Sequence, residues 1–367
     1  MEVTKIEKIS TRRFCEVRAT ITSETFEEPF ILWYRFPRWI RKFINVTNGT
    51  PFLAALLLPS MRTGEPLKIS YPVSADLLSK VDKIQTIYHQ WDPTLSIVNV
   101  NAPVDKELPR IKGERLQTGL FFSLGVDSFY TLLKEQEKIT HLLIVHGFDI
   151  FLGKHNTKLF PKVYSNVKKV AKVFDKKVIF VATNLRELSD QFVSWPKLHH
   201  GAAMASVGLH LQYLLQTIFI ASTYPYEQLH PHGSHPELDP LWSTEYVSFV
   251  HHGCEARRID KIHFIANTPI VLKTLRVCWI NPNNEYNCGR CEKCLRTMIG
   301  LYIAGVLERC ETFPHDIDPE LVRNMTVDTT GDFLSELAET LDSSERDLIL
   351  KTALREAISK NRGREHG

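Results

Sequence analysis

Residues 120–133 constrain the fold of this chain most, because they combine an apolar strand, a short polar turn and a helix start. The segment is Leu-Phe-Phe-Ser-Leu-Gly-Val-Asp-Ser-Phe-Tyr-Thr-Leu-Leu, and its turn supplies two hydroxyls, one glycine and successive backbone N–H groups. Unpaired N–H groups and the positive end of the helix dipole attract phosphate at such a helix start. The segment therefore predicts a nucleotide-phosphate turn. A serine-capped helix start that binds nothing is the alternative.

The turn differs from two common nucleotide-binding loops. No Gly-Lys-Ser or Gly-Lys-Thr follows it, and it lacks the three spaced glycines of a dinucleotide fingerprint. It resembles the Ser-Gly-Gly-x-Asp-Ser loop of the PP-loop ATP pyrophosphatase superfamily, whose members split ATP between its α- and β-phosphates. Leu124 stands where that family usually has its first glycine. The resemblance implies that ATP contacts Ser123, Leu124, Gly125, Val126, Asp127 and Ser128.

Strand and helix patterns alternate from residue 113 onward. The strand patterns lie at residues 142–145, 178–181, 218–221 and 262–265, and the helical patterns at residues 159–174 and 201–216. This alternation predicts an α/β fold with a mainly parallel sheet covered by helices on both faces. Ligands of such open sheets bind at the carboxyl ends of the strands. There we expect the turn and His146, which would contact the adenosine part of ATP.

Four cysteines have the spacing of a metal site. They form the pattern Cys-x9-Cys-Gly-Arg-Cys-Glu-Lys-Cys and are Cys278, Cys288, Cys291 and Cys294. Four thiolates without an open position are typical of a structural zinc site. The other cysteines are expected to be buried thiols without a chemical role: Cys15, Cys254 and Cys310. The basic residues near the pattern are expected to face solvent or offset its negative charge: Arg290, Lys293 and Arg296.

The chain of 367 residues is long enough for more than one domain. The predicted units are an N-terminal α+β module at residues 1–112, a PP-loop domain with the zinc knuckle at residues 113–312, and a helical extension at residues 313–367. The extension contains two amphipathic helical patterns, at residues 333–341 and 346–358.

The phosphate turn and the four-cysteine pattern together resemble the 7-cyano-7-deazaguanine synthase family of queuosine biosynthesis, over about half of the chain. The resemblance implies a Rossmann-like PP-loop fold, with ATP and Mg²⁺ as cofactors beside Zn²⁺. It also implies a ligase that adenylates a carboxylate, deazaguanine-like, for attack by ammonia or an amine, with release of AMP and pyrophosphate. For that chemistry, the negative charge of Asp127 makes it a candidate to bind magnesium or to orient the turn. Lys261 and Arg258 would neutralise the α-phosphate or the substrate carboxylate.

Residues 233–236, Gly-Ser-His-Pro, stand where the synthase has a substrate loop of Ser-Gly-Tyr-Pro type. The residues that follow are Glu-Leu-Asp-Pro, whereas the synthase has Asp-Cys-Arg-Pro. We therefore expect Ser234, His235 and Asp239 to recognise substrate, in a divergent member of natural-product or defence gene sets.

Two other classes remain open. A PP-loop tRNA-modifying thiolase or lysidine-type enzyme is one, but the 45 basic and 42 acidic residues are interspersed and form no strong nucleic-acid signal. A non-catalytic nucleotide-binding protein is the other. The chain lacks an apolar run of membrane length or a signal-peptide core, so a cytoplasmic location is expected. The resemblance favours a homodimer, and the amine acceptor could be ammonia, a small molecule, or a protein or peptide end.

Overall fold

The structure is a computed structural model that describes residues 1–105, 117–153, 158–327 and 332–362. Within these residues, ten strands form one sheet and two short strands pair separately. In spatial order the ten strands are β12 (Ser248–His252), β11 (Thr217–Ala221), β8 (Thr118–Phe121), β9 (His141–His146), β10 (Lys177–Thr183), β3 (Phe30–Pro37), β2 (Phe14–Thr22), β1 (Glu2–Ser10), β4 (Leu67–Ile69) and β6 (Val100–Asn101). The separate pair is β5 (Val73–Ser74) with β7 (Val104–Asp105).

Five strands, β12, β11, β8, β9 and β10, run parallel to one another. Along the chain, β8, β9 and β10 follow one another in one direction, whereas β11 and β12 lie on the other side of β8. The strand order therefore reverses between β8 and β11. In open α/β sheets, ligands bind at the carboxyl ends of the strands beside such a reversal. The predicted α/β class with a mostly parallel central sheet is confirmed.

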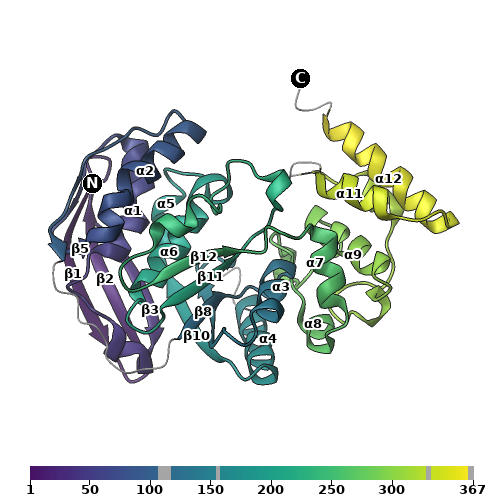
Figure 1. The fold of residues 1–367 in the computed structure, drawn as a ribbon, viewed down its shortest axis with the longest axis horizontal. Helices are drawn as coiled ribbons and strands as arrows, with labels where there is room; N and C mark the ends of the chain where they lie inside the picture. The colour runs from purple at the N-terminus through teal and green to yellow at the C-terminus, as the bar shows by residue number, and fades with distance from the viewer. Residues whose placement is uncertain (106–116, 154–157, 328–331, 363–367) are drawn as a thin grey trace.

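The N-terminal strands extend the same sheet (Figure 1). β3 pairs antiparallel with β10, with Arg35 opposite Ala182 and Tyr34 opposite Thr183. One apolar core contains residues from both sides of this pairing. Sheet and core are therefore continuous between the N-terminal segment and the central strands. The predicted boundary between residues 112 and 113 lies outside the described residues.

The helices are α1 (Thr50–Thr63), α2 (Ala75–Trp91), α3 (Val126–Lys134), α4 (Leu159–Val173), α5 (Leu185–Ser189), α6 (His200–His210), α7 (Arg258–Ala266), α8 (Pro269–Thr274), α9 (Glu292–Ile303), α10 (Pro319–Arg323), α11 (Asp332–Thr340) and α12 (Glu345–Arg362). They cover both faces of the sheet because strand side chains alternate between two cores. Phe121 belongs to the core shared with α1, α5 and α6. Its neighbours Leu120 and Phe122 belong to the core shared with α3, α4, α7 and α9.

Two sequence expectations need correction, and one strand was not predicted. Residues 262–265, expected as a strand, lie inside α7, because Ile259, Ile262 and Ile265 are buried at three-residue spacing along a helix. The helix expected over residues 201–216 ends at His210. Sequence analysis also missed β12, which is the edge strand beside β11.

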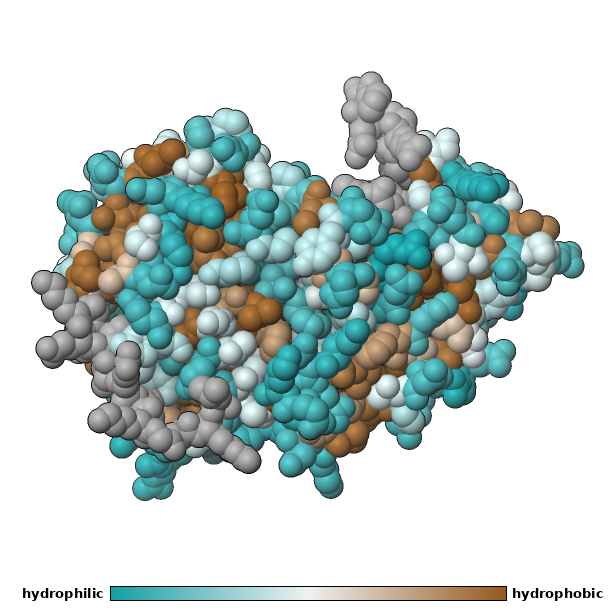
Figure 2. Space-filling view, in the orientation of Figure 1, coloured by the Kyte–Doolittle hydropathy of each residue, from teal (hydrophilic) through white to brown (hydrophobic). Residues whose placement is uncertain are grey.

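The C-terminal helices lie at one end of the elongated molecule, drawn in yellow in Figure 1. The helices expected at residues 333–341 and 346–358 correspond to α11 and α12. On the same view, Figure 2 shows mainly hydrophilic side chains with small hydrophobic areas between them. Among the described residues, no helix combines the length and the apolar character needed to cross a membrane.

Candidate functional site

The predicted phosphate turn follows β8 directly. Gly125 precedes the first residue of α3, and the Ser128 hydroxyl donates to the carbonyl oxygen of Gly125 at 3.0 Å. The Ser123 hydroxyl accepts a hydrogen bond from the N–H of Gly125 at 3.3 Å and lies 3.5 Å from the Ser128 hydroxyl. Both hydroxyls and the first N–H groups of α3 therefore lie at the carboxyl end of β8, beside the reversal of strand order.

Leu124 adopts a backbone conformation that glycine forms without strain. Its φ is 66°, in the left-handed region. That region costs a residue with a side chain about 1–2 kcal/mol. The Leu124 side chain is fully buried, and its carbonyl oxygen accepts a hydrogen bond from the N–H of Arg276 at 2.9 Å. Burial of the side chain and this hydrogen bond keep the turn in its strained backbone conformation.

Helix α7 brings two cations to Asp127. Arg258 Nη1 lies 3.0 Å from Asp127 Oδ2, and Lys261 Nζ lies 3.4 Å from Asp127 Oδ1. Lys261 Nζ also donates to the carbonyl oxygen of Ser222, just after β11, at 2.7 Å. Burial lowers the pKa of Lys261, against the effect of Asp127. Asp127, Arg258 and Lys261, which the sequence singled out, meet across the reversal of strand order.

Helix α9 adds two more cations. Arg296 is 3% exposed and lies 3.2 Å from Glu292, so the expectation that it faces solvent is wrong. The charges of Arg258 and Asp127 affect the pKa of Arg296. The charges of Arg296 and Arg258 affect the pKa of Lys293, which is half-buried. Burial lowers the pKa of both groups. We call the following set the cation cluster: Asp127, Arg258, Lys261, Glu292, Lys293 and Arg296.

Helix α11 covers the cation cluster with Phe333. The ring centroid of Phe333 lies 4.5 Å from the guanidinium carbon of Arg296 and 5.6 Å from that of Arg258. Tyr224 stacks on the same ring, with centroids 5.2 Å apart and planes inclined by 17°. Phe333 is 1% exposed. The aromatic pair therefore closes this side of the cluster to solvent.

His146 lies at the end of β9, next to β8, as expected. Its ring stacks on Phe160 with centroids 4.0 Å apart. The buried Nε2 atom of His146 has no hydrogen-bond partner among the described residues. Burial lowers the pKa of His146, which keeps the ring neutral.

The loop predicted to recognise substrate brings two of its three residues together. The Ser234 hydroxyl donates to Asp239 Oδ2 at 2.6 Å, and Asp239 is fully buried at the start of a single 3₁₀ turn, η5 (Asp239–Trp242). His235 instead packs edge to face on Trp91 of α2, with ring centroids 5.1 Å apart. Ser234 and Asp239 therefore bond each other, while His235 contacts the N-terminal part of the chain.

Two residues that sequence analysis did not place in the site complete these contacts. His251 Nδ1, in β12, lies 2.7 Å from Asp239 Oδ2 and 3.3 Å from the Ser234 hydroxyl. Cys254 donates to the Ser222 hydroxyl at 3.2 Å. Cys254 is a buried thiol outside the cysteine cluster, as the sequence suggested. It contacts Ser222, the residue whose carbonyl oxygen binds Lys261.

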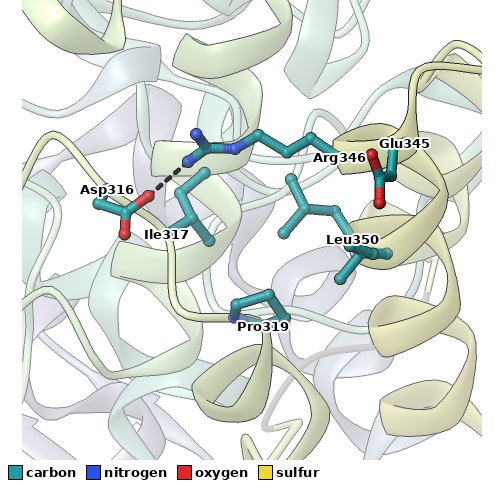
Figure 3. A pocket seen from close by; sticks show the side chains of 7 residues that line it. Asp316, Ile317, Pro319, Glu345, Arg346 and Leu350 are labelled. Atoms are coloured by element: carbon teal, nitrogen blue, oxygen red, sulfur yellow. Dashed lines mark hydrogen bonds and ion pairs between the residues drawn. The ribbon is translucent and has the colours of Figure 1, made fainter.

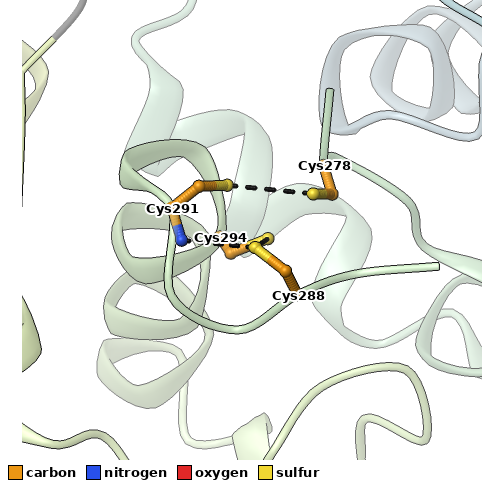
Figure 4. Close-up of side chains that lie close together, drawn as sticks. All are labelled: Cys278, Cys288, Cys291 and Cys294. Carbon is orange, nitrogen blue, oxygen red and sulfur yellow. Dashed lines mark hydrogen bonds between the residues drawn. The ribbon is translucent and has the colours of Figure 1, made fainter. Parts of the chain in front are cut away.

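The four predicted cysteines form one buried cluster, and Figure 4 shows their sulfur atoms turned toward one another. All four sulfurs lie within 4.8 Å of one another, with 3.9 Å between Cys278 and Cys291 and 3.8 Å between Cys288 and Cys294. Four sulfurs at about 2.3 Å from a tetrahedral zinc ion would be about 3.8 Å apart. The N–H groups of Asn281 and Cys291 donate to two of the sulfurs, each at 3.3 Å. The cluster could therefore bind a metal such as zinc.

Two segments join the cysteine cluster to the predicted phosphate turn. Cys291 immediately precedes α9, whose first turns carry Glu292 and Arg296. Cys278 lies two residues after Arg276, which binds the Leu124 carbonyl. A metal ion held by the cysteines would fix both segments without contacting the phosphate turn.

Two pockets lie away from the cation cluster. One, of about 300 Å³, lies between the loop before α10 and the start of α12, and Figure 3 shows the ion pair between Asp316 and Arg346 across it. The other, of about 260 Å³, lies beside Trp39 and His141 at the amino ends of the parallel strands. Neither pocket includes a residue of the cation cluster.

The phosphate turn, the cation cluster and the Ser234 loop follow the carboxyl ends of neighbouring parallel strands or pack against them. The cysteine cluster supports two of the segments that build this edge. Comparison of the chain with protein-family models, with curated proteins and with solved structures found no match.

Proposed function

We propose that this protein is an ATP-dependent ligase, with a Rossmann-like PP-loop domain, that forms AMP and pyrophosphate. The cation cluster carries the proposal, because three of its cations, Arg258, Lys261 and Arg296, lie within ion-pair distance of only two carboxylates of the cluster, Asp127 and Glu292, beside the predicted phosphate turn. Lys261, Arg258 and Arg296 are each at most 9% exposed. Buried charges are costly unless they are paired. A polyphosphate would supply the negative charge that this cluster lacks.

In the proposed reaction, a substrate carboxylate oxygen attacks the α-phosphorus of ATP, and the bond to pyrophosphate breaks. The Ser123 and Ser128 hydroxyls and the N–H groups at the start of α3 hold the leaving pyrophosphate as negative charge moves onto it. Arg258 and Lys261 neutralise the α-phosphate or the attacking carboxylate. Ammonia or an amine then attacks the acyl carbon of the acyl adenylate, and AMP leaves.

The residues at the turn do not fit a resident magnesium ion. Both oxygens of Asp127 already face cations, one from Arg258 and one from Lys261. Mg²⁺ instead prefers several oxygen ligands in octahedral geometry. We assign Asp127 to orienting the two cations and the turn. Magnesium would then enter with the phosphates of the nucleotide.

Phe333 occupies the approach to the cluster. For a nucleotide to contact Arg296, the Phe333 ring has to leave the guanidinium group that it covers. Tyr224 would then present an aromatic face to the incoming ligand. Helix α11 is therefore the element that we expect to move when ATP binds.

The deazaguanine-like nature of the carboxylate is proposed from the sequence resemblance alone. A PP-loop tRNA-modifying thiolase is the second candidate, because Cys254 is free of the cysteine cluster and lies beside Ser222. Such an enzyme would also bind tRNA. Binding of tRNA without AMP formation from any carboxylate would favour this second candidate.

The proposal is tested by incubating the protein with ATP, Mg²⁺ and carboxy-deazaguanine and separating the nucleotides by chromatography. We expect AMP and pyrophosphate in equal amounts, and no AMP from Asp127→Ala. Glu311→Ala is the control, because the Glu311 carboxylate is exposed and pairs with the exposed Lys273 away from α7. Formation of ADP, or normal AMP release by Asp127→Ala, would contradict the proposal.

A further inference from the structure

The pocket of about 260 Å³ lies at the opposite end of the parallel strands from the cation cluster. It is found at the amino ends of these strands, whereas the predicted phosphate turn follows the carboxyl end of β8. Its lining combines two buried apolar side chains, Phe43 and Leu214, with an aromatic, a histidine and two lysine side chains. No acidic side chain is among the described residues that line it.

Two neighbouring strands and one 3₁₀ helix build this pocket. His141 and Lys177 are the first residues of β9 and β10, and they lie opposite each other in the parallel register. Strand β3 pairs antiparallel with β10, so the 3₁₀ helix η1 (Arg38–Phe43), which follows β3, lies at the amino end of β10. Side chains three residues apart are aligned along a 3₁₀ helix. Trp39 and Lys42 of η1 therefore both line the pocket.

His141 brings a buried hydrogen-bond acceptor to the pocket, and the residue is 1% exposed. The Thr140 hydroxyl accepts from the N–H of Thr118 and donates to the carbonyl oxygen of Thr118, each at 2.9 Å. Because its only hydrogen is used there, this hydroxyl accepts from Nδ1–H of His141 at 2.8 Å. Burial lowers the pKa of His141 to about 4, so the ring is neutral near pH 7. Its Nε2 atom therefore holds a lone pair, and this atom has no hydrogen-bond partner among the described residues.

Trp39 and the two lysines add an aromatic face and positive charge. The Trp39 ring stacks on the His141 ring, with centroids 6.2 Å apart and planes inclined by 27°, and Trp39 is 45% exposed. Lys42 Nζ lies 4.6 Å from the centroid of the Phe43 ring, and Lys177 is exposed beside His141. An exposed indole offers a flat face to an aromatic ring, and ammonium groups attract a carboxylate.

The buried Nε2 atom of His141 is the observation that points to a ligand. Buried acceptors are normally paired, because an unpaired one loses its hydrogen bond to water without replacement. The Trp39 ring stacks on this imidazole. A ligand that donates to Nε2 therefore has to shift the Trp39 ring, and its binding should change the surroundings of the indole.

We propose that this pocket binds a small aromatic carboxylate whose ring carries an N–H or O–H donor. The ring stacks on Trp39, the carboxylate pairs with Lys42 and Lys177, and the donor bonds to Nε2 of His141. This site is separate from the proposed nucleotide site, so the proposal does not depend on adenylation.

Two compounds that differ in one ring atom test the proposal. Pyrrole-2-carboxylate has a ring N–H, and furan-2-carboxylate has an oxygen in its place. We expect tryptophan fluorescence to show saturable binding of pyrrole-2-carboxylate to the wild type and at least about tenfold weaker binding of furan-2-carboxylate, because only the first donates to Nε2. His141→Phe should remove this difference, with melting curves to check that it folds. Absence of pyrrole-2-carboxylate binding to the wild type, or equal affinity for both compounds, would overturn the proposal.

Matched surface variants test where the compound binds. Saturation-transfer NMR of pyrrole-2-carboxylate measures binding without the indole signal, and we expect Trp39→Leu and Lys177→Ala each to weaken it several-fold. Trp279→Leu is the control for the first, because Trp279 is 51% exposed and does not line the pocket. Lys138→Ala is the control for the second, because Lys138 is exposed and pairs with Glu135. Binding that both pocket variants leave unchanged would place the compound elsewhere and overturn the proposal, even if His141→Phe does not fold.

Discussion

Leu124 places backbone strain in the phosphate turn, and two substitutions measure it. Leu124→Ala and Leu124→Gly both remove a fully buried side chain, a loss of about 2–5 kcal/mol, but only glycine relieves the positive φ. We expect Leu124→Gly to be more stable than Leu124→Ala by about 1 kcal/mol in urea unfolding. This reverses the usual order, in which glycine is the less stable. The usual order would contradict a strained turn.

His251 and Cys254 affect the pH dependence of stability in opposite directions. The pKa of folded His251 is about 9, above the unfolded value of about 6.5. Its contribution is therefore complete below about pH 6.5 and is lost as the pH rises through about 9. The lowered pKa of Cys254 makes a contribution that grows as the pH rises toward the unfolded value of about 8.5. The facing histidines, His200 and His235, stay neutral because burial lowers the pKa of each.

These signs predict that the two contributions offset each other in the wild type. In Cys254→Ser, the contribution of Cys254 is lost, and His251 keeps the part of its contribution that Asp239 supplies. We expect the free energy of unfolding of Cys254→Ser to fall more than that of the wild type between about pH 6.5 and pH 9. Urea titrations at both pH values measure this difference. Equal pH dependence in both proteins would contradict these opposing contributions.

Local spacing allowed the strand, turn and helix start at residues 120–133 and the four-cysteine cluster to be predicted from sequence. Each of these motifs lies on one short, continuous stretch of the chain. The contact between Asp239 and His251 could not be predicted this way, because β12, which brings His251 beside Asp239, was itself missed. Arg296 gave a weaker signal, since Glu292 precedes it by four residues on the same helix face.

At the scale of elements, the chemical character of residues 262–265 was misleading. Ile-His-Phe-Ile has the composition of a strand, but the same isoleucines continue a helical pattern from Ile259. The side chain of Asp260 accepts a hydrogen bond from the N–H of Arg257, which favours a helix start there. Isoleucines that recur every three residues and a favourable helix start together outweigh the strand propensity of this segment.

The cysteine cluster predicts how the elements around it respond to metal loss. We expect the purified chain to hold about one zinc ion, and a strong chelator or Cys288→Ser to remove it. The cysteines fix the start of α9 and the segment at Arg276. Metal loss should therefore also weaken nucleotide binding, although the metal ion itself does not contact the nucleotide. Metal analysis and calorimetry test both effects, with Cys310→Ser as the control that keeps zinc. Unchanged nucleotide binding after metal loss would contradict this coupling.

At the scale of the whole molecule, one sheet and one apolar core extend across the N-terminal and central parts of the chain. Strand β3 covers the edge of β10, and residues of α1 and α6 pack in the same core. Separate sequence patterns before and after residue 113 indicated two units, but patterns of local periodicity carry no information on which strand edges pair. The pairing of β3 with β10 is the feature that joins them.

This continuity predicts that the central part of the chain depends on the N-terminal part. A protein of residues 117–367 would expose the edge of β10 and the apolar face that α1 covers. Exposed strand edges and large apolar surfaces cause aggregation. We expect this protein to be insoluble or to form aggregates in size-exclusion chromatography. A stable, folded monomer would show that residues 113–312 form an independent domain.

The central claim is that the phosphate turn and the cation cluster bind a nucleoside triphosphate. Isothermal titration calorimetry with a non-hydrolysable ATP analogue tests it most directly, with the wild type, Lys261→Ala and the surface control Lys273→Ala on α8. The account predicts one binding site per chain in the wild type and in Lys273→Ala, and no measurable binding to Lys261→Ala. Absence of binding to the wild type, or equal affinity in all three proteins, would contradict it.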